Sequence, residues 1–184
     1  MRSISQFILK IIGWELDDQA PQTNRYVLIA YPHTSNWDFI LGMLAKWAMN
    51  MPLNWVAKHS IFWGPFKPLF IAIGGVPLDR EKSAGFIQTN VDLFEQRDEF
   101  VLGLMPEGTR SKTNRLKTGF YHIAHGAGVP LVLAYLDYKN KKIGVGMVMR
   151  VSGDIEADFE IIRKFYQDKT GYKPEKASDL KIKI

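Results

Sequence analysis

The chain has 184 residues, which suffice for one sizeable hydrophobic core but not for two ordinary domains, so we expect a single domain over residues 1–184. Apolar residues make up 46% and charged residues 23%, a balance that excludes a disordered or fibrous chain. The absence of cysteine excludes disulfide scaffolds, thiolate zinc sites and cysteine nucleophiles. A formal net charge of +5 favours an anionic partner, whether nucleic acid, anionic lipid or a small phosphorylated or acidic molecule.

The first 14 residues predict a short amphipathic helix. Its apolar stripe recurs at helical spacing and consists of Ile4, Phe7, Ile8, Ile11 and Ile12. A basic helix of this kind could lie in a membrane interface or pack on its own domain, and the sequence leaves both open. No stretch predicts a transmembrane helix, because the most apolar one, residues 60–78, contains three prolines and three glycines. Lys10 interrupts the apolar run and no small-residue cleavage site follows, which argues against a signal peptide.

The remaining pattern alternates strands with helices. The predicted strands cover residues 26–31, 54–58, 100–105, 130–138 and 143–149. The predicted helices cover residues 39–47, 86–94, 119–125 and 153–170, and a proline-broken apolar segment precedes Gly74. This alternation predicts an α/β fold with a mixed or mostly parallel sheet flanked by helices. Sheets of this type carry their chemistry in loops at the carboxyl ends of strands.

The first such loop, residues 32–38, carries a histidine and a carboxylate. His33 and Asp38 could act as a base and its orienting partner, because a carboxylate can fix one imidazole tautomer and stabilise the cation that forms. The spacing of Ser35 and Asp38 is also that of a helix capping box, which needs no catalysis. The sequence does not choose between the two roles.

The second loop, residues 106–110, reads Pro-Glu-Gly-Thr-Arg and directly follows a predicted strand. Gly108 permits a sharp turn and a close backbone approach to a ligand, and Arg110 offers a planar fork that suits phosphate oxygens. Taken alone, the same residues also fit an ordinary turn with a surface ion pair.

Together the two loops resemble the glycerolipid acyltransferases, the family of 1-acylglycerol-3-phosphate (lysophosphatidate) acyltransferases. Four motifs of that family occur in order over about residues 26–138, and the ordered set is far more specific than any one motif. They are His-x4-Asp at 33–38, Gly-Gly followed by Asp-Arg at 74–80, Pro-Glu-Gly-Thr-Arg at 106–110 with Lys-x-Gly at 117–119, and Val-Pro opening a strand at 129–130.

The resemblance implies that a substrate hydroxyl attacks an acyl thioester, with His33 as general base and Asp38 as its orienting partner. It implies a glycerol-phosphate acyltransferase-like fold. The substrate-binding residues that it implies are Arg80, Glu107, Gly108, Thr109, Arg110 and Lys117. Arg80, Arg110 and Lys117 would bind the acceptor phosphate. No cofactor or metal is expected, because acyl-CoA or acyl carrier protein delivers an already activated acyl group.

The implied function is transfer of an acyl chain to a lysophospholipid, with lysophosphatidate giving phosphatidate. We accordingly expect a cytoplasmic protein peripherally associated with the membrane. Nucleic acid is not an expected partner, because the lysines are scattered rather than gathered in one stripe. Another lysolipid acceptor, a hydrolase that uses the same His-Asp pair and a non-catalytic basic lipid-binding module remain alternatives, although a hydrolase would lack the Gly-x-Ser-x-Gly nucleophile motif.

Three further features have ordinary structural explanations beside functional ones. His122 and His125 are three apart on a predicted helix, but no third metal ligand is evident. Residues 139–142 form a basic cluster that is typical of a solvated hairpin turn and could also contact anionic lipid or an acidic carrier protein. The aromatic segment 55–70 reads mostly as core, although part of it could line an acyl tunnel or enter a bilayer.

Overall fold

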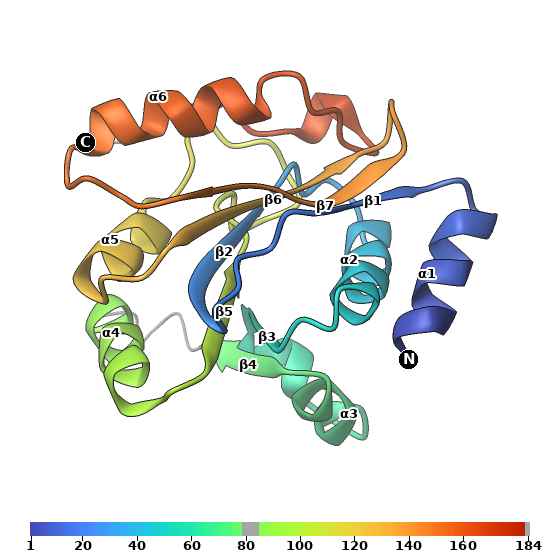
Figure 1. The fold of residues 1–184 in the computed structure, drawn as a ribbon, viewed down its shortest axis with the longest axis horizontal. Helices are drawn as coiled ribbons and strands as arrows, with labels where there is room; N and C mark the ends of the chain where they lie inside the picture. The colour runs from blue at the N-terminus through green and yellow to red at the C-terminus, as the bar shows by residue number, and fades with distance from the viewer. Residues whose placement is uncertain (79–84, 183–184) are drawn as a thin grey trace.

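The computed structural model describes residues 1–78 and 85–182, and it forms a seven-stranded sheet flanked by helices (Figure 1). The strands are β1 (Glu15–Asp18), β2 (Arg25–Tyr31), β3 (Leu53–Lys58), β4 (Gly75–Leu78), β5 (Phe100–Leu104), β6 (Leu131–Asp137) and β7 (Lys142–Met149). The helices are α1 (Arg2–Ile11), α2 (Trp37–Ala48), α3 (Lys67–Ala72), α4 (Phe86–Gln96), α5 (Gly119–Gly126) and α6 (Ile155–Tyr166), with short 3-10 turns at His59–Phe62 and Pro174–Lys176.

The strand order is β1-β7-β6-β2-β5-β3-β4, and only the β6–β7 pair is antiparallel. The sheet is therefore mixed but mostly parallel, which confirms the predicted fold class. Strand β2 lies between β5 and β6 and runs parallel to both. The carboxyl ends of these three central strands consequently meet at one edge of the sheet.

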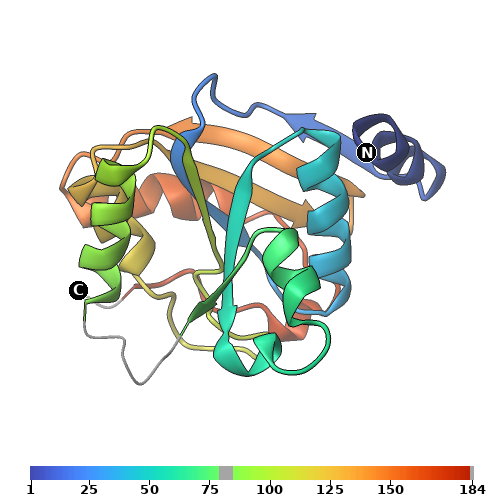
Figure 2. The same cartoon turned by 90° about the horizontal axis from the view of Figure 1, so that it is seen from below.

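The core has three layers, because β2 is buried on both faces and its side chains alternate between them. Val27 and Ile29 face the cluster formed with α4, α5 and α6, whereas Leu28 and Ala30 face the side covered by α2. Helix α1 packs against the outer side of α2 (Figures 1 and 2). Both faces of the central strands are thus shielded from water, and the loops at their ends remain accessible.

All five predicted strands and all four predicted internal helices are present, with ends shifted by a few residues. Strands β1 and β4 and helix α3 were not predicted. Each of these strands has only four residues and lies at an edge of the sheet. Pro77 lies within β4, a position that a proline tolerates only because an edge strand does not need every backbone donor.

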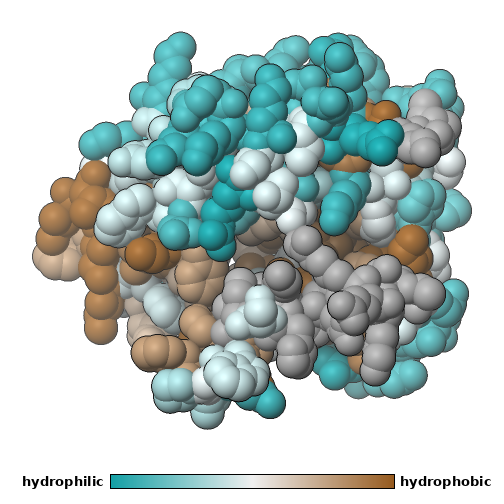
Figure 3. Space-filling model, turned by 180° about the vertical axis from the view of Figure 1, so that it is seen from behind, coloured by the Kyte–Doolittle hydropathy of each residue, from teal (hydrophilic) through white to brown (hydrophobic). Residues whose placement is uncertain are grey.

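Helix α1 packs on the domain through one face and leaves most of its apolar stripe in solvent. It packs through Ser5 and Leu9, which are buried, while Ile4, Phe7 and Ile11 on the apolar stripe are exposed to solvent. Viewed from behind, hydrophobic side chains gather on the surface where α1 lies (Figure 3). Within the described residues, no helix has the length and hydrophobicity required to cross a bilayer.

Candidate active site

The His33 loop and the Glu107 loop follow the carboxyl ends of β2 and β5. Because β2 and β5 are parallel neighbours, with Ile29 opposite Leu104, the two loops lie next to each other in space. The sequence separates them by about seventy residues, and the sheet brings them together. A direct contact joins them, since the backbone N–H of His33 donates a short hydrogen bond to Glu107 Oε2.

Asp38 lies in the first turn of α2, and its carboxylate is fully engaged. Oδ2 accepts hydrogen bonds from the backbone N–H groups of Thr34 at 2.7 Å and Ser35 at 2.8 Å, and Oδ1 accepts one from the hydroxyl of Tyr138 at 2.7 Å. The residue is only 3% exposed. Burial by itself would raise the pKa of this carboxyl, but the contacts with His33, Tyr138 and the two amides lower it below its usual range. Asp38 is therefore held in its charged form.

His33 presents one ring nitrogen to this carboxylate and the other to the surroundings. Nδ1 lies 3.2 Å from Asp38 Oδ2, within ion-pair distance although out of line for a full hydrogen bond. Contacts of this kind commonly tighten when substrate binds. Nε2 makes no hydrogen bond within residues 1–78 and 85–182, and the side chain keeps 13% of its surface exposed. The ring is thus placed to accept a proton at Nε2 while Asp38 stabilises the resulting cation.

The geometry of Asp38 is compatible with both roles considered for it. The carboxylate caps the start of α2 by accepting the amide of Ser35, as in a capping box, and the same oxygen faces His33. The Ser35 hydroxyl accepts from the amide of Trp37 rather than from that of Asp38, so only half of the capping box forms. The capping contacts fix the carboxylate in position beside the imidazole.

Glu107 is buried, and both of its carboxyl oxygens bind backbone amides. Oε2 accepts from His33 and Oε1 accepts from Ser178 at 3.0 Å, and the residue is 2% exposed. Burial raises the pKa of this carboxyl, and hydrogen bonds from the amides of Ser178 and His33 and from the Ser178 side chain oppose that rise. The structure therefore places Glu107 where it fixes the backbone on which His33 is carried.

The cationic candidates lie on the outer side of the second loop. Gly108 has φ of +65°, and a Cβ there would lie 2.9 Å from Lys117 Nζ, so the lysine crosses closely over the loop. Arg110 and Lys117 are exposed, and neither forms an ion pair with any described residue. Thr109 is half-buried and its hydroxyl accepts from the amide of Ser111. Arg80, the remaining candidate, lies outside the described residues.

A C-terminal segment, residues 170–182, packs along both loops and was not anticipated from the sequence. The amide of Lys173 donates to the Thr34 hydroxyl, and the hydroxyl of Tyr31 donates to the carbonyl of Ser178 at 2.8 Å. The amide of Leu116 donates to the carbonyl of Lys181. In each contact the C-terminal segment contributes a backbone group, which carries no sequence pattern that could have revealed it.

Tyr138 was also missed. It follows β6, whose carboxyl end lies beside that of β2, so the rule that loops at this edge carry chemistry would have pointed to it. It belongs to none of the four motifs.

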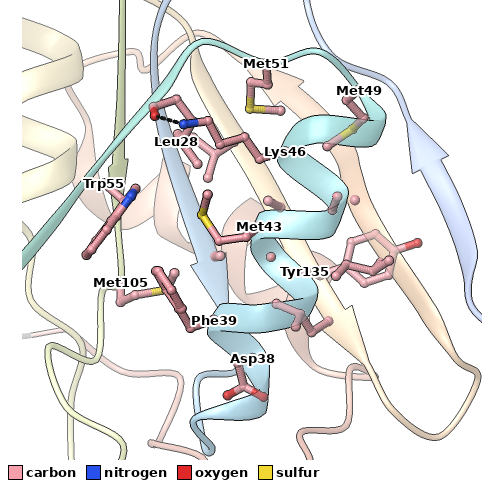
Figure 4. A pocket seen from close by; sticks show the side chains of 18 residues that line it. Leu28, Asp38, Phe39, Met43, Lys46, Met49, Met51, Trp55, Met105 and Tyr135 are labelled. Atoms are coloured by element: carbon pink, nitrogen blue, oxygen red, sulfur yellow. Dashed lines mark hydrogen bonds between the residues drawn. The ribbon is translucent and has the colours of Figure 1, made fainter. Parts of the chain in front are cut away.

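An apolar groove begins at Asp38 and runs between α2 and the sheet (Figure 4). Phe39 and Met43 line it from α2, and Trp55 and Met105 line it from β3 and the end of β5. Lys46 lines it farther along α2, where its ammonium donates to the carbonyls of Leu53 at 2.8 Å and Ile73 at 2.6 Å. Burial lowers the pKa of Lys46. The groove thus joins the His-Asp pair to an elongated apolar space.

Residues 1–78 and 85–182 contain no group of three His, Asp or Glu side chains arranged to hold a metal ion. His122 and His125 are both exposed, and the ring of His125 stacks on that of Tyr121. The pair therefore gains no third ligand from the described part of the fold.

A family model described as Acyltransferase matches residues 14–136. The chain belongs to this family. The match covers β1 to β6 and includes both loops of the site. The C-terminal segment and Tyr138 lie beyond it.

Two relatives of this chain are named 1-acyl-sn-glycerol-3-phosphate acyltransferase. The one from Escherichia coli strain K12 is 32% identical over 120 residues, which are 61% of this chain and 47% of the relative. The one from Haemophilus influenzae is 27% identical over 144 residues, which are 73% of this chain and 59% of the relative. The chain thus spans about half the length of these curated relatives.

The crystal structure of the 1-acyl-sn-glycerophosphate (LPA) acyltransferase, PlsC, from Thermotoga maritima has a similar fold, with a TM-score of 0.57 and 15% identity. The similarity covers 91% of this chain and 73% of that chain. It extends well beyond the family match and includes most of the described structure.

Proposed function

We propose that this acyltransferase transfers an acyl chain from an acyl thioester to the free hydroxyl of a lysophospholipid, with lysophosphatidate as the acceptor and phosphatidate as the product. One observation carries the proposal. The His33–Asp38 pair lies where an apolar groove meets a loop with two exposed cations that are unpaired among the described residues. A long acyl chain needs an apolar groove, a reacting hydroxyl needs a base, and a phosphate needs cations. The names of the relatives point to the same substrate class.

The reacting proton is assigned to His33. A free hydroxyl is a poor nucleophile at neutral pH, so a base must remove its proton as the new ester bond forms. With Nδ1 facing the ionised Asp38, Nε2 accepts that proton and the imidazolium is stabilised by the carboxylate. The thiol then leaves as the tetrahedral intermediate collapses, and the imidazolium can supply its proton.

The acyl chain is assigned to the groove. Its walls near the His-Asp pair are formed by Phe39, Met43 and Met105, which offer no charge to a hydrocarbon chain. Burying such a chain stabilises the complex by about 0.8 kcal/mol per methylene fully removed from water. The thioester carbonyl would then lie at the Asp38 end of the groove, close to His33.

The acceptor phosphate is assigned to Arg110 and Lys117. Arginine binds phosphate oxygens through a planar fork, and lysine adds a mobile point charge. Gly108 leaves room for Lys117 to lie directly over the loop backbone. Arg80 is expected to assist from the neighbouring segment.

Helix α1 is assigned to the membrane surface. It exposes Ile4, Phe7 and Ile11 and carries Arg2 and Lys10 on the same short helix. The basic turn between β6 and β7 adjoins it, because Lys141 Nζ would lie 3.5 Å from a Cβ on Gly13 and the amide of Glu15 donates to the carbonyl of Lys141. Apolar side chains next to cations suit the interface of an anionic bilayer.

The direct test incubates a labelled acyl thioester with the protein, with and without lysophosphatidate. Acyl transfer gives labelled phosphatidate only when the acceptor is present. Release of free fatty acid without acceptor would indicate a hydrolase, and no conversion would indicate a binding module. His33→Ala should abolish the product, whereas His122→Ala, which removes an exposed histidine on α5, should not.

A substrate panel refines the assignment. Acyl-CoA and acyl carrier protein are compared as donors, and lysolipids with and without a phosphate monoester are compared as acceptors. Preference for a neutral lysolipid would overturn the role given to Arg110 and Lys117 while leaving the His33 chemistry in place.

A further inference from the structure

We propose that Tyr138 is a positioning residue for the His33–Asp38 pair: its hydroxyl holds one carboxylate oxygen of Asp38 so that the other stays directed at His33. The catalytic consequence rests on the proposed function, but the coupling between Tyr138 and Asp38 can be measured without it. Tyr138 lies outside the region matched by the family model and outside the four sequence motifs.

The two oxygens of Asp38 have different partners. Oδ2 receives the amides of Thr34 and Ser35 and faces His33 Nδ1, whereas the only donor to Oδ1 among the described residues is the Tyr138 hydroxyl, at 2.7 Å. Asp38 is buried, so water has little access to replace a lost donor. Without the Tyr138 hydroxyl, one oxygen of a buried and ionised carboxylate would have no donor, which would destabilise the charged form of Asp38.

The Tyr138 ring is itself held from two sides. Its centroid lies 4.9 Å from that of Trp14, edge to face, and 5.2 Å from that of Tyr172. Its backbone N–H donates to the carbonyl of Thr170 at 2.8 Å. A hydroxyl on a ring fixed by packing can hold a neighbouring group within the narrow range of geometry that catalysis needs.

The electrostatics agree with this geometry. Burial, and after it the hydrogen bond to Asp38, raises the pKa of Tyr138 above its ordinary value, so the phenol remains a donor. The titratable groups around Asp38 are His33 on its own loop, Tyr138 after β6, and then Tyr172 beside Tyr138 and Glu107 behind His33. Among the described residues, His33 and Tyr138 alone contact the Asp38 carboxylate through side chains.

The test compares Tyr138→Phe with Tyr121→Phe. Tyr121 is a matched control, because its hydroxyl also donates to a buried carboxylate, Asp158 Oδ2 at 2.8 Å, on the other side of the sheet. Each substitution removes one oxygen and leaves a phenyl ring. Both variants are therefore expected to lower the stability of the fold. Tyr138→Phe alone is expected to affect the His33–Asp38 pair.

The first measurement is a titration of Asp38 by NMR on protein with 13C-labelled aspartate carboxyl groups, with the signal assigned by its loss in Asp38→Asn. Tyr138→Phe should raise the pKa of Asp38 by about one pH unit, because a donor to the charged form is lost. Tyr121→Phe should leave that pKa unchanged. An unchanged Asp38 titration in Tyr138→Phe would overturn the proposal.

The second measurement is steady-state acyl transfer. Tyr138→Phe should lower kcat about tenfold with KM nearly unchanged, because the contact between Asp38 and His33 is loosened while substrate binding is not. In an Asp38→Asn background the substitution should have little further effect. An equal loss in both backgrounds, or a higher KM alone, would refute positioning through Asp38. If the unmodified protein transfers no acyl group, the proposed function fails while the titration still decides the coupling.

Discussion

The outward stripe of α1 gives a prediction that separates membrane docking from core packing. Replacing Phe7 and Ile11 together by serine should strongly weaken binding to anionic vesicles and leave the melting temperature almost unchanged. The reason is the split within one helix: Phe7 and Ile11 are 63% and 67% exposed, whereas Leu9 is 1% exposed. Phe7 and Ile11 therefore have surface left to bury in a bilayer, whereas Leu9 has almost none.

The size of the effect follows from the exposed surface. Complete burial of a phenylalanine or isoleucine side chain is worth about 1.5–3 kcal/mol, so burying the remaining two thirds is worth about 1–2 kcal/mol each. The pair should contribute about 2–4 kcal/mol, which corresponds to a roughly 30-fold to several-hundred-fold weaker partition coefficient. Each cation near the membrane surface adds about 1 kcal/mol to the binding free energy, and high salt should remove this electrostatic contribution but not the apolar one.

The assay is cosedimentation with vesicles that contain anionic lipid, at low and high salt, beside a thermal melt. Ile161→Ser removes an exposed isoleucine from α6 and should leave vesicle binding unchanged. Leu9→Ala should lower stability by about 2–5 kcal/mol, as expected for a buried leucine. Normal vesicle binding by the Phe7 and Ile11 variant, together with a clear fall in melting temperature, would refute the reasoning and assign this face of α1 to the fold.

Three further predictions concern the site. His33→Ala should reduce turnover by about 10²- to 10⁴-fold in the labelled-thioester assay with an unchanged melting temperature, and near-normal turnover would remove His33 from the chemistry. Asp38→Asn should lower turnover by orders of magnitude and stability by about 1–2 kcal/mol at neutral pH. Because the pKa of Asp38 is lowered in the folded state, this stability difference should be present above the usual aspartate pKa and vanish as the pH falls through the lowered value, which melts at several pH values can check. Joint replacement of Arg110 and Lys117 by glutamine should raise KM for lysophosphatidate about tenfold or more and spare a lysolipid without a phosphate monoester; an equal effect on both acceptors would contradict phosphate binding.

Much of the fold could be predicted from periodicity, because the central strands are buried on both faces and read as apolar runs. The elements that escaped prediction are stabilised by their surroundings rather than by their own pattern. Strand β4 forms next to β3 because Gly75 allows close contact: a Cβ there would lie 2.7 Å from the Phe62 ring and 2.8 Å from that of Trp55. Packing therefore explains why glycine stands at position 75 of the Gly-Gly motif, and only the tertiary structure reveals this.

The site could be predicted in part for a comparable reason. A histidine and a carboxylate five positions apart can be recognised along the chain, and the sheet topology then places the second loop beside them. Two further contacts of the site come from distant parts of the chain. Tyr138 contacts Asp38 from 100 residues farther along the chain, and Ser178 contacts Glu107 from 71 residues farther along. Ser178 donates its backbone N–H to Glu107, a group that any residue other than proline could supply, so the sequence does not reveal this hydrogen bond.

The two buried carboxylates of the site differ in a way that fits the separate roles proposed for them. Asp38 and Glu107 each accept two backbone amides, and burial raises the pKa of both. Asp38 also contacts the side chains of His33 and Tyr138, and together with the amides these contacts bring its pKa below the usual range, whereas burial keeps the pKa of Glu107 raised. The lowered pKa keeps Asp38 charged, and a charged carboxylate can stabilise an imidazolium. In the proposed mechanism these contacts suit Asp38 to be the partner of the base, while Glu107 holds the backbone amide of His33.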